Sequence, residues 1–170
     1  MATLDALLIA VSLYSRIKNA LDLSSSLDTI QRNKSYSFTD GAGADQADVH
    51  WSDERTLAAS ATEDLDLAGG LTDAFGAAIT FARIKAIYVE ADSANTNNVL
   101  LGGAAANAFA TPFADASDKV TLRPGGALLL VAPDATGYVV TASTADLLRV
   151  GNSGAGTSVK YRIMLVGSLT

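Results

Sequence analysis

Turn-forming residues divide the second part of the chain into short apolar segments, and this pattern most constrains the fold. From about residue 56 onward, apolar runs alternate with Gly, Asn, Asp and Pro at intervals of roughly 8–15 residues, as in proteins built from short strands. We expect strands at residues 56–67, 82–91, 98–102, 119–123, 127–132, 138–143, 147–152 and 158–167. Because no strand–helix alternation is visible, the pattern disfavours a doubly wound fold and predicts an antiparallel, jelly-roll-like β-sandwich.

The last of these segments has the clearest strand pattern. One face of this strand would carry Val159, Tyr161, Ile163 and Leu165, and Lys160 would lie on the other face. Strict alternation of this kind predicts a half-buried strand. Tight turns are expected at residues 124–126 and 133–137, which are rich in Pro and Gly, and residues 107–118 lack a period and are expected to form a loop.

The N-terminal segment has a different apolar spacing. Apolar residues recur mostly three or four positions apart from Leu4 to Leu21, which predicts a helix, with Thr3 as a possible N-cap. Such a helix could pack on its own domain or on a neighbouring subunit. The residues expected to form its self-association face are Leu4, Leu7, Leu8, Val11, Tyr14 and Ile17.

Residues 28–53 are polar and irregular, and they predict an extended arm rather than a packed element. Residues 40–43 have the composition of a turn, since Gly readily adopts positive φ. Long structureless segments are uncommon inside compact domains, so this arm is expected to become ordered against a partner. The chain is therefore divided into a helix and arm at residues 1–55 and a β-sandwich at residues 56–170.

Length, charge and cysteine content exclude several classes of protein. The 170 residues suffice for one domain with a hydrophobic core, and the absence of Cys rules out disulfides. A formal net charge of −6 disfavours binding to nucleic acid. The apolar run at residues 7–14 is too short to span a bilayer, and it follows Asp5 rather than the positive charge of a signal peptide, so no membrane association is expected.

No group of residues has the spacing that catalysis or metal binding requires. His50 is the only histidine, and a metal site built from it with Asp48, Asp53 or Glu54 would lack further nitrogen ligands. Ser153 lies between glycines but lacks the pattern of a serine nucleophile, and the glycines around it precede a strand rather than a helix. Asp64 with Asp66, and the polar segment at residues 92–98, are typical of solvated turns. We therefore expect no enzyme activity, no cofactor and no metal.

Several short segments of the sequence resemble those of a known group of proteins. These are Trp51-Ser52-Asp53-Glu54-Arg55-Thr56-Leu57, Glu63-Asp64-Leu65-Asp66-Leu67-Ala68-Gly69, Phe75-Gly76, Pro124-Gly125-Gly126-Ala127-Leu128, and Tyr161-Arg162-Ile163 with Val166-Gly167. Over residues 51–170 the chain resembles small structural proteins of tailed-bacteriophage particles, in particular head decoration (cement) proteins.

The resemblance implies a jelly-roll-like domain that assembles as a dimer or trimer on a capsid lattice, in a virion built in the bacterial cytoplasm. The expected partners are copies of the same chain and the major capsid protein or other virion proteins. The arm residues expected to contact the capsid are Ser35, Tyr36, Phe38, Val49 and Trp51. Two other hypotheses stay open at this point: a tail or baseplate component, and a carbohydrate-binding β-sandwich that uses exposed aromatic rings.

Overall fold

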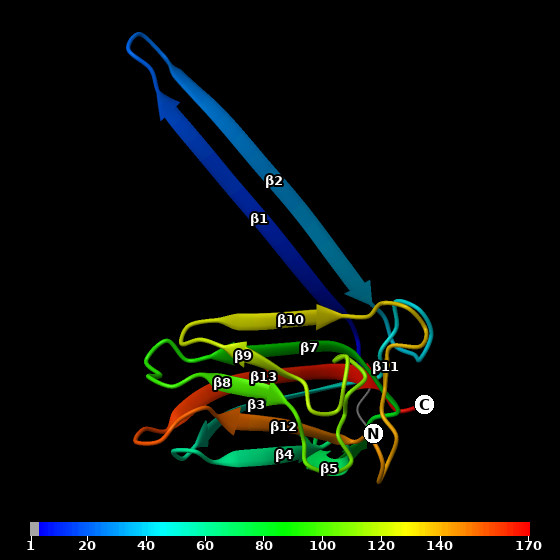
Figure 1. Ribbon diagram of the computed structural model, residues 1–170. Helices are drawn as coiled ribbons and strands as arrows, with labels where there is room; N and C mark the ends of the chain where they lie inside the picture. Colours follow the sequence, from blue (N-terminus) through cyan, green and yellow to red (C-terminus); the bar gives the residue numbers. More distant parts are fainter. Residues whose placement is uncertain (1–3) are drawn as a thin grey trace.

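Two antiparallel sheets form the body of the protein (Figure 1). The structure is a computed structural model that describes residues 4–170. The larger sheet has the order β10-β7-β13-β3, with β11 also paired to β7. Its strands are β3 (Val49–Leu57), β7 (Arg83–Ala91), β10 (Ala127–Val131), β11 (Tyr138–Val139) and β13 (Val159–Ser168).

The smaller sheet has the order β4-β12-β8-β9. Its strands are β4 (Thr62–Asp66), β8 (Val99–Gly102), β9 (Lys119–Leu122) and β12 (Leu147–Asn152), and a separate pair consists of β5 (Ala68–Thr72) and β6 (Ala78–Thr80). Residues 4–170 contain no helix, and hence none long and apolar enough to cross a membrane.

One hydrophobic core lies between the two sheets. In β13, Val159, Tyr161, Ile163 and Leu165 are buried while Lys160 and Arg162 are exposed, so the predicted face of this strand is confirmed. The smaller sheet contributes buried residues from β4, β8 and β12, including Leu65, Leu101 and Val150. Alternation along each strand thus directs apolar side chains inward from both sides.

The strand pattern predicted for the body is confirmed in most of its parts. Each predicted strand overlaps an observed one, and residues 107–118 contain no strand. The segment at residues 56–67 was predicted as one strand and instead contains the end of β3, a turn at residues 58–61 and β4. Positive φ at Ser60 reverses the chain there, and short β5 and β6 were not predicted.

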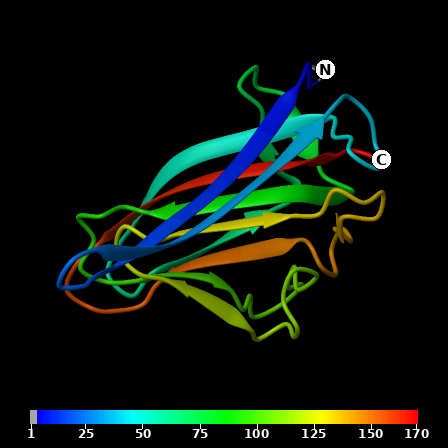
Figure 2. The same ribbon diagram turned by 90° about the horizontal axis from the view of Figure 1, so that it is seen from above.

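The predicted N-terminal helix is wrong: this segment is the first strand of a long hairpin. Strand β1 (Leu7–Ala20) pairs with β2 (Ser25–Phe38) over fourteen successive residue pairs, and residues 21–24 form the tip. The hairpin projects from the body (Figure 1), and from above it crosses obliquely over the larger sheet (Figure 2). Thr3, the predicted N-cap, lies outside the described residues.

The residues of β1 explain why a strand forms. Ile9, Val11 and Ile17 are β-branched, which favours extended backbone, and apolar residues also occur at every second position from Leu7 to Leu13. The spacings of three and four that suggested a helix come from counting residues of both strand faces together. A second alternating segment, β2, follows within hairpin distance and pairs with the first.

The predicted arm at residues 28–53 is not one extended segment. Its first part belongs to β2, its last part to β3, and residues 39–48 form a compact loop on the body. Asp45 donates its backbone N–H to the carbonyl oxygen of Pro133 at 2.7 Å. Buried Lys85 donates its Nζ to the carbonyl oxygens of Gly43 and Asp134, and burial lowers the pKa of this lysine. These bonds hold the loop without any partner.

A polar cluster ties the two sheets together at one edge of the core. The hydroxyl of buried Tyr161 in β13 donates to Glu63 Oε1 in β4 at 2.7 Å. Arg55 Nη1 in β3 donates to Glu63 Oε2 at 2.6 Å, so both carboxylate oxygens have partners. Burial and the neighbouring Glu63 carboxylate raise the pKa of Tyr161 well above its ordinary value.

Leu165→Ala should lower the free energy of unfolding by about 2–5 kcal/mol, because a fully buried leucine leaves a cavity when truncated. Urea denaturation followed by tryptophan fluorescence measures the change. The matched control is Leu23→Ala at the solvent-exposed tip, where the free energy should change by about 0.5 kcal/mol or less. Equal effects at the two positions would contradict the assigned core.

The free energy of unfolding should decrease as pH rises above 10.0, the ordinary pKa of a tyrosine. Unfolded Tyr161 would ionise there while the folded state keeps its proton, so the unfolded state gains stability at alkaline pH. Urea titrations between about pH 8 and pH 11 measure the slope. Tyr161→Phe should flatten it, whereas Tyr14→Phe on the exposed hairpin should leave it unchanged.

Candidate assembly surface

The two faces of the hairpin differ in polarity. Residues that pair directly across an antiparallel ribbon lie on the same face, so the register of β1 and β2 assigns every side chain to one side. We call the first side the apolar face; its hydrophobic residues are Leu7, Ile9, Val11, Leu13, Ile17, Ile30, Tyr36 and Phe38. Arg32 and Lys34 also lie on it, opposite Leu13 and Val11, as does Asp28, opposite Ile17.

The other side is the polar face. It carries mainly hydroxyl, amide and charged side chains: Ser12, Arg16, Lys18, Ser25, Thr29, Gln31, Asn33, Ser35 and Ser37. Ser12 Oγ donates to Asn33 Oδ1 at 2.8 Å across the ribbon. Leu8 and Tyr14 of β1 and Leu27 of β2 are the large hydrophobic residues on this face. The hairpin is therefore suited to an arrangement in which another surface covers the apolar face and water contacts the polar face.

The base of the hairpin is anchored to the outer face of the larger sheet. Phe38 is fully buried in a small second core with Ala86 of β7 and Val166 of β13. The inner ends of both strands complete this contact through Leu7, Ile9 and Tyr36. The backbone N–H of Leu4 also donates to the carbonyl oxygen of Asp48 at 2.8 Å, which holds the start of the hairpin beside β3.

Beyond its base, the apolar face is not covered by any other part of residues 4–170. The exposed fraction is 61% for Leu13, 66% for Ile17 and 50% for Ile30. At the tip, Leu21 and Leu23 are also exposed. A two-stranded ribbon is at best marginally stable in water, and an uncovered apolar face adds the cost of hydrating these side chains.

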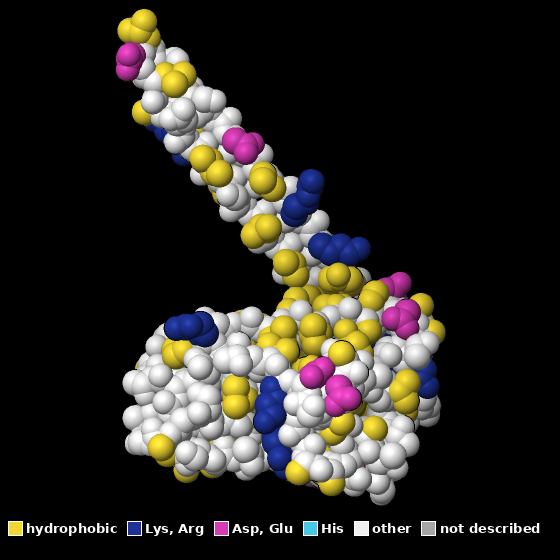
Figure 3. All heavy atoms as spheres, in the orientation of Figure 1, with side chains coloured by type: hydrophobic (Ala, Val, Ile, Leu, Met, Phe, Trp, Pro, Cys, Tyr) yellow, Lys and Arg dark blue, Asp and Glu magenta, His cyan; other side chains and the backbone are white. Residues whose placement is uncertain are grey.

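An apolar shelf on the larger sheet continues the surface of the hairpin base. Tyr88, Leu129 and Met164 are paired neighbours on β7, β10 and β13, and we call this row the shelf. A hollow of about 250 Å³ lies between the shelf and the hairpin residues Leu7 and Ile9. Figure 3 shows hydrophobic side chains gathered where the hairpin meets the body and continuing along the hairpin.

A charged row borders the shelf. Arg162 of β13 lies between Glu54 and Glu90, with Nε 2.8 Å from Glu54 Oε2 and Nη1 3.2 Å from Glu90 Oε1. A hydrogen bond from Lys160 lowers the pKa of Glu54, and the positive charge of Arg162 lowers it further. The outer face of the larger sheet thus changes from apolar near the hairpin base to charged farther away.

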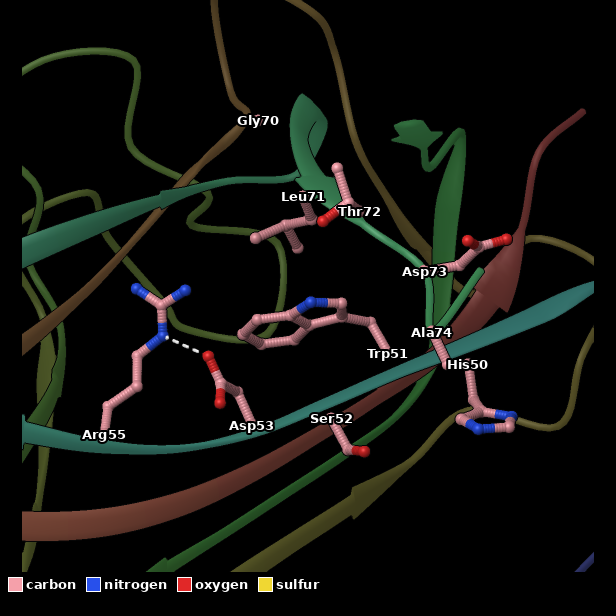
Figure 4. A pocket seen from close by; sticks show the side chains of 10 residues that line it. All are labelled: His50, Trp51, Ser52, Asp53, Arg55, Gly70, Leu71, Thr72, Asp73 and Ala74. Atoms are coloured by element: carbon pink, nitrogen blue, oxygen red, sulfur yellow. Dashed lines mark hydrogen bonds and ion pairs between the residues drawn. The ribbon is translucent and has the colours of Figure 1, made fainter. Parts of the chain in front are cut away.

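A separate hollow of about 310 Å³ lies beside Trp51 (Figure 4). The guanidinium of Arg55 lies 5.4 Å from the centroid of the Trp51 ring, and Arg55 Nε donates to Asp53 Oδ2 at 2.9 Å. His50 and Ser52 point to the opposite side of β3 from this ring (Figure 4). The imidazole of His50 and the hydroxyl of Ser52 therefore lie on the opposite face of β3 from Asp53 and Arg55 (Figure 4).

Other residues considered for chemistry have structural roles. Asp64 forms a bidentate ion pair with Arg149 of the neighbouring strand, with both distances 2.7 Å. Ser153 Oγ accepts the backbone N–H of Asn98 at 2.9 Å in a turn between strands. Asn95 bonds the backbone of Lys160 through both its amide oxygen and nitrogen. Residues 4–170 contain no group of three or more His, Cys, Asp or Glu side chains placed to hold a metal ion.

The structure distributes the six predicted self-association residues over three environments. Leu7, Val11 and Ile17 lie on the apolar face, Leu8 and Tyr14 lie on the polar face, and Leu4 is buried at the base. A helix would have placed them together, whereas a strand separates odd from even positions. The residues that complete the apolar face, Ile9, Leu13 and Ile30, were missed, although alternation in the two segments flanking residues 21–24 could have revealed them.

Three of the predicted capsid-contact residues are inaccessible. Phe38, Val49 and Trp51 are buried in the chain's own cores, because residues 49–57 form a strand paired to β13 and not an arm. Tyr36 is half-buried at the hairpin base, and Ser35 alone is fully exposed, on the polar face. These five residues therefore form no common surface.

Comparisons with known proteins add no relative. A scan of protein-family models, a search of curated proteins and a search of solved structures each give no match to this chain. The geometry of the hairpin and of the larger sheet is thus the basis on which a function can be argued.

Proposed function

We propose that this chain is a non-enzymatic structural protein of a bacteriophage particle, and most specifically a decoration protein that stabilises the capsid by binding the major capsid protein. The observation that carries the proposal is the hairpin, which projects from a compact body and exposes apolar residues along its length. Exposed apolar surface of this extent is typical of a protein that functions in an assembly. The phage context comes from the resemblance of residues 51–170.

The strand order supports a jelly-roll body. Numbering the eight main strands along the chain, from β3 to β13 without the short β5, β6 and β11, gives one sheet with strands 1, 8, 3 and 6 and a second with strands 2, 7, 4 and 5. Successive strands thus change sheet at every step except from strand 4 to strand 5, an interleaving that is typical of jelly rolls, a common architecture of viral capsid proteins.

The length of the hairpin suits a bridging role. Strands of 14 residues extend roughly 45 Å, which is enough to cross from one protein subunit to the next. The exposed leucines of the tip, Leu21 and Leu23, are the residues that we assign to contact with a capsid subunit. Contacts repeated around a shell would join capsomers, since each standard interface buries roughly 1,600 Å².

Two other hypotheses receive different support. A tail or baseplate component would use the same hairpin, and its location and number of copies in a particle separate it from a decoration protein. A carbohydrate-binding module receives less support: its candidate rings for stacking on sugars are Trp51, Tyr88, Tyr138 and Tyr161, and the first and last of these are buried.

Immunogold electron microscopy of the source phage, with antibody against this chain, tests the proposal. Label spread evenly over the heads would support a decoration protein, and label confined to tails would favour the tail hypothesis. Particles without any label would contradict a role in the virion.

Leu23→Asp should weaken binding of the purified protein to heads that lack it by roughly tenfold or more, since a buried apolar contact would become charged. Sedimentation of heads with bound protein measures the affinity. Ser24→Asp introduces the same charge next to Leu23 and should bind almost as the unchanged chain does. Equal binding by both variants and the unchanged chain would exclude the tip as the capsid contact.

A further inference from the structure

We propose that the apolar face of the hairpin binds a second copy of this chain, on the outer face of the larger sheet at the shelf formed by Tyr88, Leu129 and Met164. The inference goes beyond the role in a phage particle and does not depend on it, because it concerns only surfaces of this chain. Four properties of the molecule lead to it.

The first is that the apolar face needs a cover that its own body does not provide. Figure 1 shows the hairpin rising away from the larger sheet, so that only its base touches the body. Leu13, Ile17 and Ile30 are at least half exposed along the outer part of the hairpin. Because an isolated ribbon is marginally stable, a surface from another molecule is required to hold it.

The second is the charge of the two parts. The hairpin carries Arg16, Lys18, Arg32 and Lys34 against Asp22 and Asp28, which gives a net charge of +2. Because the whole chain has a formal net charge of −6, the remaining residues together carry −8. The hairpin of one copy is therefore attracted to the body of another, whereas two hairpins repel each other.

The third is a match in pattern between the two surfaces. On the apolar face, Arg32 and Lys34 lie beside Leu13 and Val11. On the larger sheet, Glu54 and Glu90 flank Arg162 in the row next to the shelf, so these three side chains keep one negative charge in excess. A hairpin laid across this sheet can place apolar side chains on the shelf and basic side chains near the carboxylates, which would leave few charges unpaired.

The fourth is the area available. The part of the apolar face beyond the base, ten residue pairs from Val11 to Ala20, measures roughly 33 Å by roughly 10 Å, or about 330 Å². A stable interface buries roughly 800 Å² on each partner, so one such contact is too small. If every copy gives one hairpin and receives one, the area per copy doubles to about 660 Å², which is at the lower end of the range for specific interfaces and favours a closed dimer or ring with exchanged hairpins.

Sedimentation velocity over a range of protein concentrations tests the inference. The unchanged chain should form a closed oligomer, and Leu13→Asp on the apolar face should weaken the association by roughly tenfold or more. Gln31→Asp places the same charge on the polar face and should associate as the unchanged chain does. A chain that stays monomeric up to millimolar concentration, or equal behaviour of the two variants, would overturn the proposal.

Mixing two defective variants tests where the hairpin binds. Tyr88→Asp damages the shelf but keeps the hairpin, whereas Leu13→Asp damages the hairpin but keeps the shelf. Each variant alone should associate weakly, and the mixture should associate more tightly than either variant but more weakly than the unchanged chain, because only one of its two contacts has both an intact hairpin and an intact shelf. If Tyr88→Asp associates normally, or if the mixture associates no more tightly than the separate variants while both melt like the unchanged chain, the shelf is not the binding surface.

A spectroscopic measurement covers the case in which Tyr88→Asp does not fold. Because the chain has no Cys, a spin label can be attached to Cys introduced by Ile17→Cys on the apolar face or by Arg16→Cys on the polar face. Raising the protein concentration should immobilise the label at position 17 and leave the label at position 16 mobile. Equal mobility at both positions would overturn the proposal, and a failure of virion labelling would leave this result unaffected.

Discussion

The packing of Phe38 against Ala86 and Val166 is the contact on which the shape of the protein depends. Phe38 ends β2, and its burial joins a ribbon to the outer face of the larger sheet. Burying a side chain of this size contributes about 1.5–3 kcal/mol, which is enough to fix the direction of the hairpin but not to cover its length. The body therefore buries most of its own large apolar side chains, whereas the hairpin leaves many of its apolar side chains exposed.

The net charge also differs between the body and the hairpin. Most acidic residues lie in the body, where several are neutralised by cross-strand partners such as Arg149 and Arg162, while the hairpin is basic. The hairpin of one copy and the body of another attract each other, whereas two hairpins, or two bodies, repel each other. This division favours contacts in which different surfaces of two copies meet, and it disfavours aggregation of hairpins through their apolar faces.

The strands of the body could be predicted because their limits are set locally, by turn residues such as Pro124 and Gly125. The hairpin was mistaken for a helix because Leu4, Leu7, Val11 and the following apolar residues satisfy a helical period, and alternation in the same segment was overlooked. Whether residues 7–20 form a helix or a strand depends on their pairing with residues 25–38. The spacing of apolar residues within residues 4–21 does not reveal this pairing.

The candidate site was less predictable for a similar reason. Whether Trp51 is a contact residue or a core residue depends on the pairing of β3 with β13, more than 100 positions away along the chain. Burial of Phe38 likewise requires β7 and β13 to be in place. A sequence window contains the residue types but not the distant strands that cover them, so exposure is the property most easily misjudged.

The location of the hairpin anchor has a consequence for the order of folding. The hairpin closes through local pairs and can form early, but Val166 and Met164, on which its base rests, belong to the last strand of the chain. During synthesis the anchor and the shelf are therefore incomplete until β13 has emerged from the ribosome. A nascent chain without β13 would lack the proposed docking surface, so the order of synthesis would delay the proposed association until β13 has been made.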